Sequence, residues 1–292
     1  MKTNRRTAIK QLAGSAALLS VPTSMTHAMN STSSVPLKGN IHHSVCKWCY
    51  NDIPLDEFCV KAKEMGLSSV ELLGPDEWPT LKKHGLTCAL AAYWEDGFGI
   101  EKCWNRTEHH DALVALYEKS IPMVAEAELK QIITFSGNRD GMDDETGMKN
   151  CAEGLKRIMP LAEENNVLVV MELLNSKVNH PDYMCDHTEW GVALCDMIGS
   201  DNFKLLYDIY HMQIMEGDVI ATIQKYHPYI SHYHTGGVPG RAEIDNTQEL
   251  YYPAIMRAIL DTGFEGFVAQ EFIPKQQDAL ASLQEGVTIC DV

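Results

Sequence analysis

The feature that most constrains the fold is a strict alternation of apolar, strand-like runs with amphipathic, helix-like runs from residue 39 onward. Eight runs of each kind follow one another, over roughly 250 residues. Such alternation predicts parallel strands, because each helix returns the chain to the same end of the sheet. Eight units of this length predict a single-domain α/β fold, a closed (β/α)8 TIM barrel.

The expected strands are short apolar runs bounded by turn residues. They are 40–45, 69–73, 86–92, 131–135, 167–172, 203–208, 229–234 and 267–271. The expected helices have apolar residues at helical spacing. They are 54–66, 78–84, 107–129 with a kink at Pro122, 145–166, 188–198, 218–226, 250–262 and 275–285. A doubly wound open sheet is the rival arrangement, but no glycine-rich turn of the GxGxxG kind follows the first strand.

The amino-terminal segment, residues 1–28, has the pattern of an export signal. It contains the pair Arg5-Arg6, then a weakly apolar run at 12–21, then Thr-His-Ala at 26–28 as a cleavage-like sequence. A paired-arginine block before an apolar run is typical of the twin-arginine route. We therefore expect a signal peptide at 1–28 and a periplasmic protein.

The remaining chain is expected to comprise a linker at 29–38 and one barrel domain at 39–292. The formal net charge is −16, and removal of residues 1–28, with four basic side chains and no acidic ones, would lower it to −20. This charge argues against nucleic acid, which is bound by neutralising phosphates with a basic face. No run approaches the ~18 apolar residues of a membrane span. We expect a small-molecule substrate as the partner, and the sequence leaves open whether the protein forms a homo-oligomer.

Cysteine usage does not point to a disulfide framework. The chain has nine cysteines at irregular spacing. Cys46 and Cys49 form a CxxC, but no second CxxC completes a four-thiolate zinc site. We interpret them as two cysteines that end the first barrel strand.

Four consecutive expected strands end on side chains of the types that bind cations. Glu172, Asp208, His234 and Glu271 stand at the ends of the last four expected strands, 36, 26 and 37 residues apart. The carboxyl ends of barrel strands converge on one mouth, so these side chains should meet there. Carboxylates after apolar runs are costly to bury without a countercharge. The set predicts one divalent cation, Mn²⁺ or Mg²⁺, with Zn²⁺ or Co²⁺ as alternatives.

Two carboxylates across a cation predict a proton-transfer reaction. One glutamate can remove a proton beside a carbonyl, and the other can manage the proton on the opposite side. This chemistry is typical of aldose–ketose isomerisation or epimerisation.

His211, in the loop after Asp208, could hydrogen-bond a substrate oxygen, and Arg241 could pair with a substrate carboxylate or with Glu243. His232 shares the parity of His234 and is expected to lie one layer deeper. The aromatic loop 93–106 is expected to be either a lid or a loop packed on a neighbouring subunit.

Residues 207–217 carry a family resemblance. The run YDIYHMQ, followed by MEG at 215–217, resembles the hydroxypyruvate isomerase family of the xylose isomerase-like barrel superfamily. Further matches are Glu172 with Asn175, His234, PGR at 239–241 with Glu243, YPAI at 252–255, and Glu271. The resemblance implies that Glu172, Asp208, His234 and Glu271 hold the metal and that both glutamates are catalytic. It implies substrate contacts for His211, Arg241, Glu243 and Asn175.

The chain also departs from that family. Thr-Gly-Gly at 235–237 follows His234 where the isomerases carry an alanine–aspartate pair, and the segment after Arg241 lacks their proline–glycine–threonine–glycine turn. The expected function is therefore a metal-dependent sugar or keto-acid isomerase or epimerase. The alternatives are a metal-dependent dehydratase of a cyclitol or sugar acid on the same barrel and a non-catalytic sugar-binding barrel. A metal-dependent endonuclease is disfavoured by the charge and by ligands for only one metal.

Overall fold

The computed structural model describes residues 36–95 and 97–292. The expected signal peptide, and residues 29–35 of the expected linker, lie outside these residues. Residues 36–292 form one compact unit. Within it, Lys38 donates its backbone N–H to the Asp291 carboxylate at 2.8 Å, so the start of the described chain is tied to its end.

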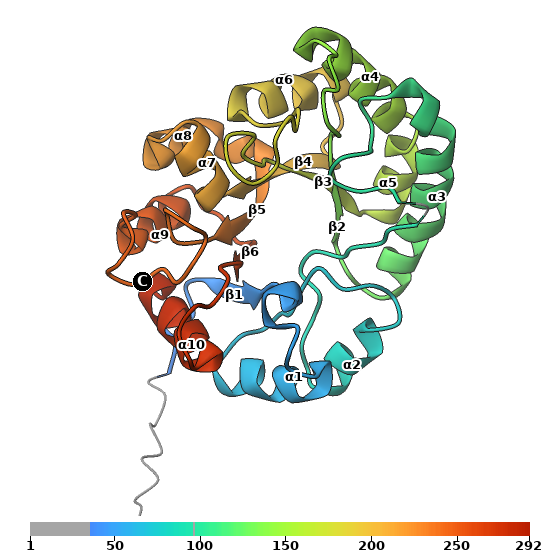
Figure 1. Ribbon diagram of the computed structural model, residues 1–292. Coiled ribbons are helices and arrows are strands. Elements are labelled where there is room, and N and C mark those ends of the chain that lie inside the picture. Colours follow the sequence, from blue (N-terminus) through green and yellow to red (C-terminus); the bar gives the residue numbers. More distant parts are fainter. Residues whose placement is uncertain (1–35, 96) are drawn as a thin grey trace, which may run out of the picture. The chain divides into compact units, whose positions relative to one another are not determined.

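Six strands form one parallel sheet that curls around the centre of this unit (Figure 1). The sheet order is β1-β6-β5-β4-β3-β2. The strands are β1 (His42–Val45), β2 (Gln131–Thr134), β3 (Leu168–Glu172), β4 (Phe203–Asp208), β5 (Ile230–Thr235) and β6 (Phe267–Gln270). Because all neighbours are parallel, the carboxyl ends of β3 to β6 lie at the same edge, as the alternation predicted.

The second and third expected strands complete the ring but are not regular strands. Isolated parallel bridges join Cys46 to Glu71, Leu73 to Ala91, and Ala91 to Ile132. The expectation of eight regular strands is corrected to six strands and two extended segments. The segment at 69–73 is interrupted because Leu72 adopts a left-handed φ of 59°. In the neighbouring segment, the backbone N–H of Ala89 donates to the hydroxyl of Ser69 at 2.8 Å.

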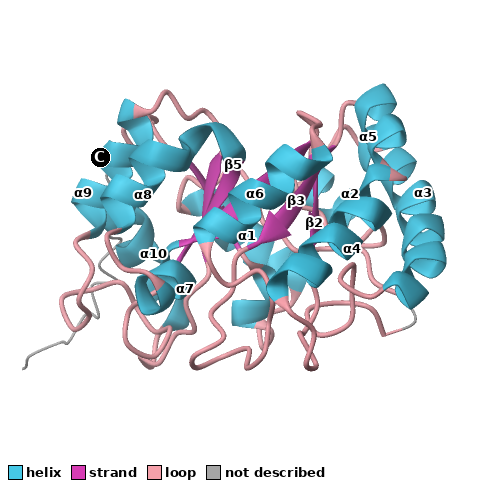
Figure 2. Ribbon diagram, turned by 90° about the horizontal axis from the view of Figure 1, so that it is seen from above, coloured by secondary structure: helices cyan, strands magenta, loops and turns pink. Residues whose placement is uncertain are grey.

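The helices lie outside the strands (Figures 1 and 2). The α-helices are α1 (Leu55–Glu64), α2 (Trp78–Lys83), α3 (His110–Glu126), α4 (Asp144–Lys156), α5 (Met159–Asn165), α6 (Thr188–Ile198), α7 (Ile209–Met215), α8 (Val219–Tyr226), α9 (Tyr252–Asp261) and α10 (Ala279–Cys290). Short 3-10 helices are η1 (Lys47–Tyr50), η2 (Thr107–His109) and η3 (His227–Tyr229). The buried apolar faces of the α-helices pack on the outer face of the strands and give one continuous core.

Three helical expectations need correction. The helix expected at 145–166 is two helices, because turns at Arg157 and Ile158 separate α4 from α5. The last helix begins at Ala279 rather than 275, since the Asp278 carboxylate caps it by accepting from the Ala281 N–H at 2.9 Å. The segment after Asp208, expected to be a loop at His211, is helix α7.

None of the helices in the described part of the chain is both long and apolar enough to cross a membrane.

Candidate active site

The four predicted ligands meet at the carboxyl ends of neighbouring strands. Glu172 ends β3, Asp208 ends β4, His234 lies in β5, and Glu271 follows β6 directly. One ligand atom from each lies within 4.8 Å of those of the other three, and all four side chains are buried. The convergence follows from the parallel register, in which Asp208 is paired with His234 across β4 and β5.

This cluster has the chemistry of a cation site. Glu172 Oε1 and Asp208 Oδ2 are buried and have no hydrogen-bond partner among the described residues. Burial raises the pKa of Asp208 to about 8, although Arg241 opposes the shift. Burial, and then the neighbouring Glu271, raise the pKa of Glu172. A divalent cation would satisfy the unpartnered oxygens and favour the ionised carboxylates, and three carboxylates with one imidazole suit Mn²⁺ or Mg²⁺.

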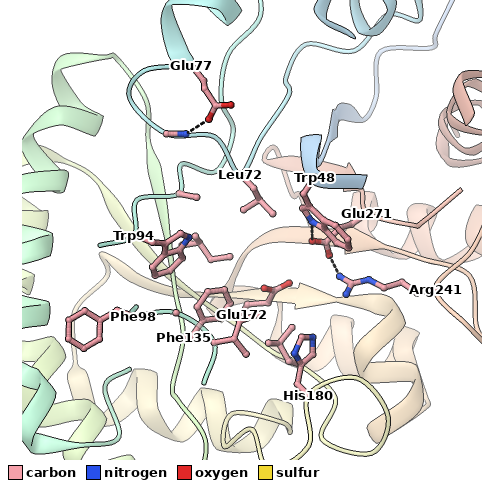
Figure 3. Close-up of a pocket in the computed structure, with 16 residues that line it drawn as sticks. Trp48, Leu72, Glu77, Trp94, Phe98, Phe135, Glu172, His180, Arg241 and Glu271 are labelled. Carbon is pink, nitrogen blue, oxygen red and sulfur yellow. Dashed lines mark hydrogen bonds and ion pairs between the residues drawn. The ribbon is translucent and has the colours of Figure 1, made fainter. Parts of the chain in front are cut away.

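The Glu271 carboxylate is surrounded by donors. Trp48 Nε1 donates to Glu271 Oε1 at 2.9 Å, and the Arg241 guanidinium donates to Glu271 Oε2. Figure 3 shows both contacts converging on this carboxylate. His234 Nδ1 lies 2.9 Å from Oε2. Burial acts to raise the pKa of Glu271, but Arg241 and His234 outweigh it and hold that pKa well below its ordinary value. Glu172 and Glu271 therefore differ strongly in proton affinity.

Arg241 points into the cluster and not toward Glu243. Its guanidinium lies 5.1 Å from the Trp48 ring centre and 5.6 Å from that of Tyr210, and 3.5 Å from Asp208 Oδ2.

Glu243, which was expected to contact substrate or to pair with Arg241, does not pair with Arg241, whose acidic partners are Asp208 and Glu271. Its carboxylate accepts from the backbone N–H groups of Lys275 and Gln276 at 2.8 and 2.9 Å, and from the Ser282 hydroxyl at 3.1 Å. It is not among the side chains that line the cavity described below. These contacts, which all end on Oε1, hold the segment after β6 in place.

His211 is held in one tautomer. It lies in the first turn of α7, not in a loop, and its backbone N–H donates to the Asp208 carboxylate at 3.0 Å. The Asn175 backbone N–H donates to His211 Nδ1 at 3.1 Å, and the Asn175 side-chain amide lies 2.6 Å from the same atom. Burial, and then Arg241, lower the pKa of His211 well below its ordinary value. A neutral ring with an accepting Nδ1 carries its proton on Nε2, which lies 3.7 Å from Asp208 Oδ2.

A second carboxylate, Glu71, lies on the other side of His234. Its Oε1 is 2.9 Å from His234 Nε2 and 2.7 Å from His232 Nε2. Its Oε2 accepts from the Ser44 hydroxyl at 2.5 Å. Burial acts to raise the pKa of Glu71, but the two histidines outweigh it and bring that pKa to about 2. His232 thus lies one layer deeper than His234, as its parity predicted.

A cavity of about 660 Å³ opens above the cluster. In Figure 3, Trp94, Phe98 and Phe135 lie on one side and Arg241 with Glu271 on the other. The Trp94 and Phe135 rings stack with centres 5.2 Å apart. Part of the aromatic loop 93–106 therefore forms a wall of the cavity.

Three residues near the cluster did not stand out in the sequence. Glu71 lies inside an apolar run, where its parity with Ser69 and Leu73 is the only signal. Trp48 lies within η1, the short 3-10 helix that follows the first strand. His180 lines the cavity with its ring centre 5.3 Å from that of His211. It comes from the loop between β3 and α6, and no sequence pattern marks it.

The CxxC does not form a metal site of its own. Cys46 is buried with Sγ 3.7 Å from His234 Nε2, and Cys49 lies within η1. Burial raises the pKa of both thiols well above the ordinary value. All nine cysteines are free thiols.

Comparison with known sequences extends this picture. Residues 60–288 match the family model described as the xylose isomerase-like TIM barrel. A 2-oxo-tetronate isomerase of Cupriavidus necator is 33% identical over 114 residues, which cover 39% of this chain and 43% of the relative. The hydroxypyruvate isomerase of Escherichia coli K12 is 28% identical over 135 residues, covering 46% and 52%. The chain spans 44% of the length of the human and mouse relatives that it matches.

Solved structures match over most of the chain. A family 2 AP endonuclease from Brucella melitensis superimposes with a TM-score of 0.74 at 23% identity, covering 85% of this chain and 96% of that one. A 3-keto-D-glucoside 4-epimerase from E. coli gives 0.70 at 17% identity, covering 85% and 98%. At these identities the similarity establishes the barrel fold, in agreement with the parallel ring described above.

Proposed function

Because this chain belongs to the xylose isomerase-like TIM barrel family, we propose that it is a metal-dependent isomerase or epimerase of a sugar or keto acid. The observation that carries the proposal is the buried cluster of Glu172, Asp208, His234 and Glu271, with two glutamates of opposite pKa shift facing one another. The names of the curated relatives, 2-oxo-tetronate isomerase and hydroxypyruvate isomerase, support the same reaction class.

The cluster would hold one divalent cation, with Mn²⁺ or Mg²⁺ favoured by its oxygen-rich donors. When bound, such a cation polarises the carbonyl and hydroxyl oxygens of a substrate. The protein residues would then do the proton work. Glu172, with its raised pKa, takes a proton from the carbon beside the carbonyl, and the electron pair of that C–H bond moves toward the carbonyl oxygen.

The second half of the reaction returns a proton. In isomerisation the proton is delivered to the carbon that carried the carbonyl oxygen, and the proton of the neighbouring hydroxyl passes to that oxygen. In epimerisation Glu271, having taken a proton from solvent, delivers it to the opposite face of the same carbon, and Glu172 releases its own proton to solvent before the next turnover. The Nε2–H of His211 and the guanidinium of Arg241 would donate hydrogen bonds to substrate oxygens, and Asn175 would act through His211 by holding its tautomer.

The cavity favours a substrate larger than a three-carbon keto acid. Its volume of about 660 Å³ lies in the range of pockets that bury drug-sized ligands. One wall is aromatic, and the apolar C–H face of a sugar can pack against it. We therefore favour a sugar or sugar acid as the substrate.

The test joins metal analysis with solvent-deuterium exchange. Purified protein is analysed for Mn, Mg, Zn and Co, then incubated in D₂O with hydroxypyruvate, fructose, tagatose and inosose. We expect a stoichiometric divalent metal and deuterium entering beside one carbonyl. Glu172→Gln and Glu271→Gln should each remain folded and lose at least about 100-fold in exchange rate. Full activity in either variant would contradict the two-glutamate mechanism.

The same experiment separates the alternatives. A new C=C signal in the NMR spectrum of the product, with loss of water, would indicate a dehydratase on the same barrel. Binding of a sugar without exchange, after each metal has been added back, would indicate a non-catalytic sugar-binding barrel.

A further inference from the structure

We infer that Glu71 is a positioning residue that presents His234 to the cation. The inference rests on the cation site of the proposed function. It concerns a side chain that lies behind the four ligands and does not face the cavity, because Glu71 is fully buried and is not part of the cavity lining.

The argument begins with the two nitrogens of His234. Nδ1 faces the cluster, 2.9 Å from Glu271 Oε2 and 3.3 Å from Glu172 Oε1. Nε2 faces the opposite way, 2.9 Å from Glu71 Oε1. Only one of these nitrogens can offer a lone pair to a cation when the ring is neutral.

Glu71 decides which nitrogen that is. An ionised carboxylate accepts hydrogen bonds and has no proton to donate, so the His234 nitrogen that faces it must carry the hydrogen. The proton is thereby placed on Nε2 and the lone pair on Nδ1, the atom directed at the cluster. A carboxylate behind a metal-binding histidine fixes the tautomer and ring orientation and raises the basicity of the ligand.

Glu71 is itself held in place by further donors. His232 Nε2 lies 2.7 Å from the same Oε1, and the Ser44 hydroxyl donates to Oε2 at 2.5 Å. With every one of these side chains fully buried, the carboxylate cannot turn toward water. The alternative is that Cys46, Glu71 and His234 themselves hold a second cation, since their ligand atoms also lie within 4.8 Å of one another. We favour the hydrogen-bonded arrangement because the 2.9 and 2.7 Å contacts are already ordinary hydrogen bonds.

The test measures cation binding directly, apart from turnover. Mn²⁺ is titrated calorimetrically into wild type, Glu71→Gln and the control Glu216→Gln. Glu216 also accepts two hydrogen bonds, from the N–H and hydroxyl of Thr188, but it lies at the end of α7, away from the cluster. Glu71→Gln should weaken Mn²⁺ binding about 10–100-fold, and the control should bind as wild type does.

A spectroscopic measurement separates positioning from general packing. In Mg²⁺-loaded, ¹⁵N-histidine-labelled wild type, the ring of His234 should carry its proton on Nε2 and none on Nδ1. In Glu71→Gln the ring of His234 should be present as a mixture of its two tautomers. This spectrum of the wild type decides the matter even if Glu71→Gln does not fold, because a proton on Nδ1 would overturn the inference.

The outcomes distinguish this inference from the proposed function. If wild type binds no Mn²⁺, both fall. If wild type and Glu71→Gln bind Mn²⁺ equally, only the role of Glu71 falls. If wild type binds two Mn²⁺ and both Glu71→Gln and Cys46→Ser bind one, Glu71 is a ligand of a second cation and the positioning role is wrong.

Discussion

Arg241 is the cation that the protein itself supplies at the cluster. Its side chain is only 10% exposed and its guanidinium lies over the rings of Trp48 and Tyr210, with Glu271 and Asp208 as its acidic partners. A planar guanidinium can stack on rings and bond carboxylates at the same time, which an ammonium group cannot.

We therefore predict that Arg241→Lys lowers turnover by at least about tenfold, although the charge is kept. The lysine would lose the stacking and the fixed direction of the hydrogen bonds. Steady-state kinetics on the substrate found by deuterium exchange measures the effect. The matched control is Arg157→Lys, since Arg157 forms a half-exposed surface pair with Asp111 at 2.9 Å. Equal activity in the two variants would refute the role given to Arg241.

At the scale of the element, the turn after β5 determines where Arg241 reaches. The Gly237 N–H donates to the Ala242 carbonyl at 2.9 Å, so the chain folds back on itself. A Cβ at Gly237 would lie 2.1 Å from the Glu243 carbonyl oxygen and 2.9 Å from that of Ala242. These are backbone atoms that cannot move aside cheaply, which gives a physical reason for a glycine at this position.

Gly237→Ala is accordingly expected to destabilise the protein by about 1–3 kcal/mol and to lower activity by displacing Arg241. Urea unfolding and kinetics together measure the two effects. Gly74→Ala serves as the control, because a Cβ at Gly74 would meet its nearest atom at 3.6 Å, an ordinary contact. A stable, active Gly237→Ala would mean that the turn does not position Arg241.

At the scale of the whole molecule, the proposed cation site would join the ends of four strands of the ring. Without a cation, buried carboxylates at the ends of β3, β4 and β6 face one another, with Arg241 and His234 as the nearby positive groups. A ligand at 100 times its Kd stabilises the folded state by about 2.7 kcal/mol, and each kcal/mol shifts the Tm of a domain of this size by about 2–4 °C.

Chelation should therefore lower the Tm by about 5–10 °C, and added Mn²⁺ should restore it. Differential scanning calorimetry provides the measurement. Asp208→Asn, which lacks one ligand, is the control and should show a much smaller metal-dependent shift. A wild-type Tm that is the same with and without chelator would argue against a cation that bridges these strands.

Export by the twin-arginine route remains a prediction, because residues 1–28 lie outside the described part of the chain. Expression of the full chain followed by cell fractionation tests it. The protein should be found in the periplasm, and a variant with Arg5→Lys and Arg6→Lys should stay in the cytoplasm. Periplasmic recovery of that variant would contradict the proposed route.

Much of the fold was predictable from local pattern. The parallel sheet, the place of Glu172, Asp208, His234 and Glu271 at strand ends, and their convergence follow from hydrophobic periodicity, which is a property of neighbouring residues along the chain. The irregularity of the second and third strands was not predictable. The left-handed conformation of Leu72 and the hydrogen bond from the Ala89 N–H to the Ser69 hydroxyl both depend on the neighbouring segment.

The sequence by itself thus determined the barrel and the four candidate ligands, because strand order and chain direction bring strand ends to one mouth. Only the tertiary structure decided the directions of the side chains around them. Arg241 contacts Glu271 and Asp208 instead of Glu243. Glu71, some 160 residues from His234 in the chain, is a hydrogen-bond partner of His234. Such contacts between distant strands depend on register and rotamers in three dimensions, which no spacing along the chain records.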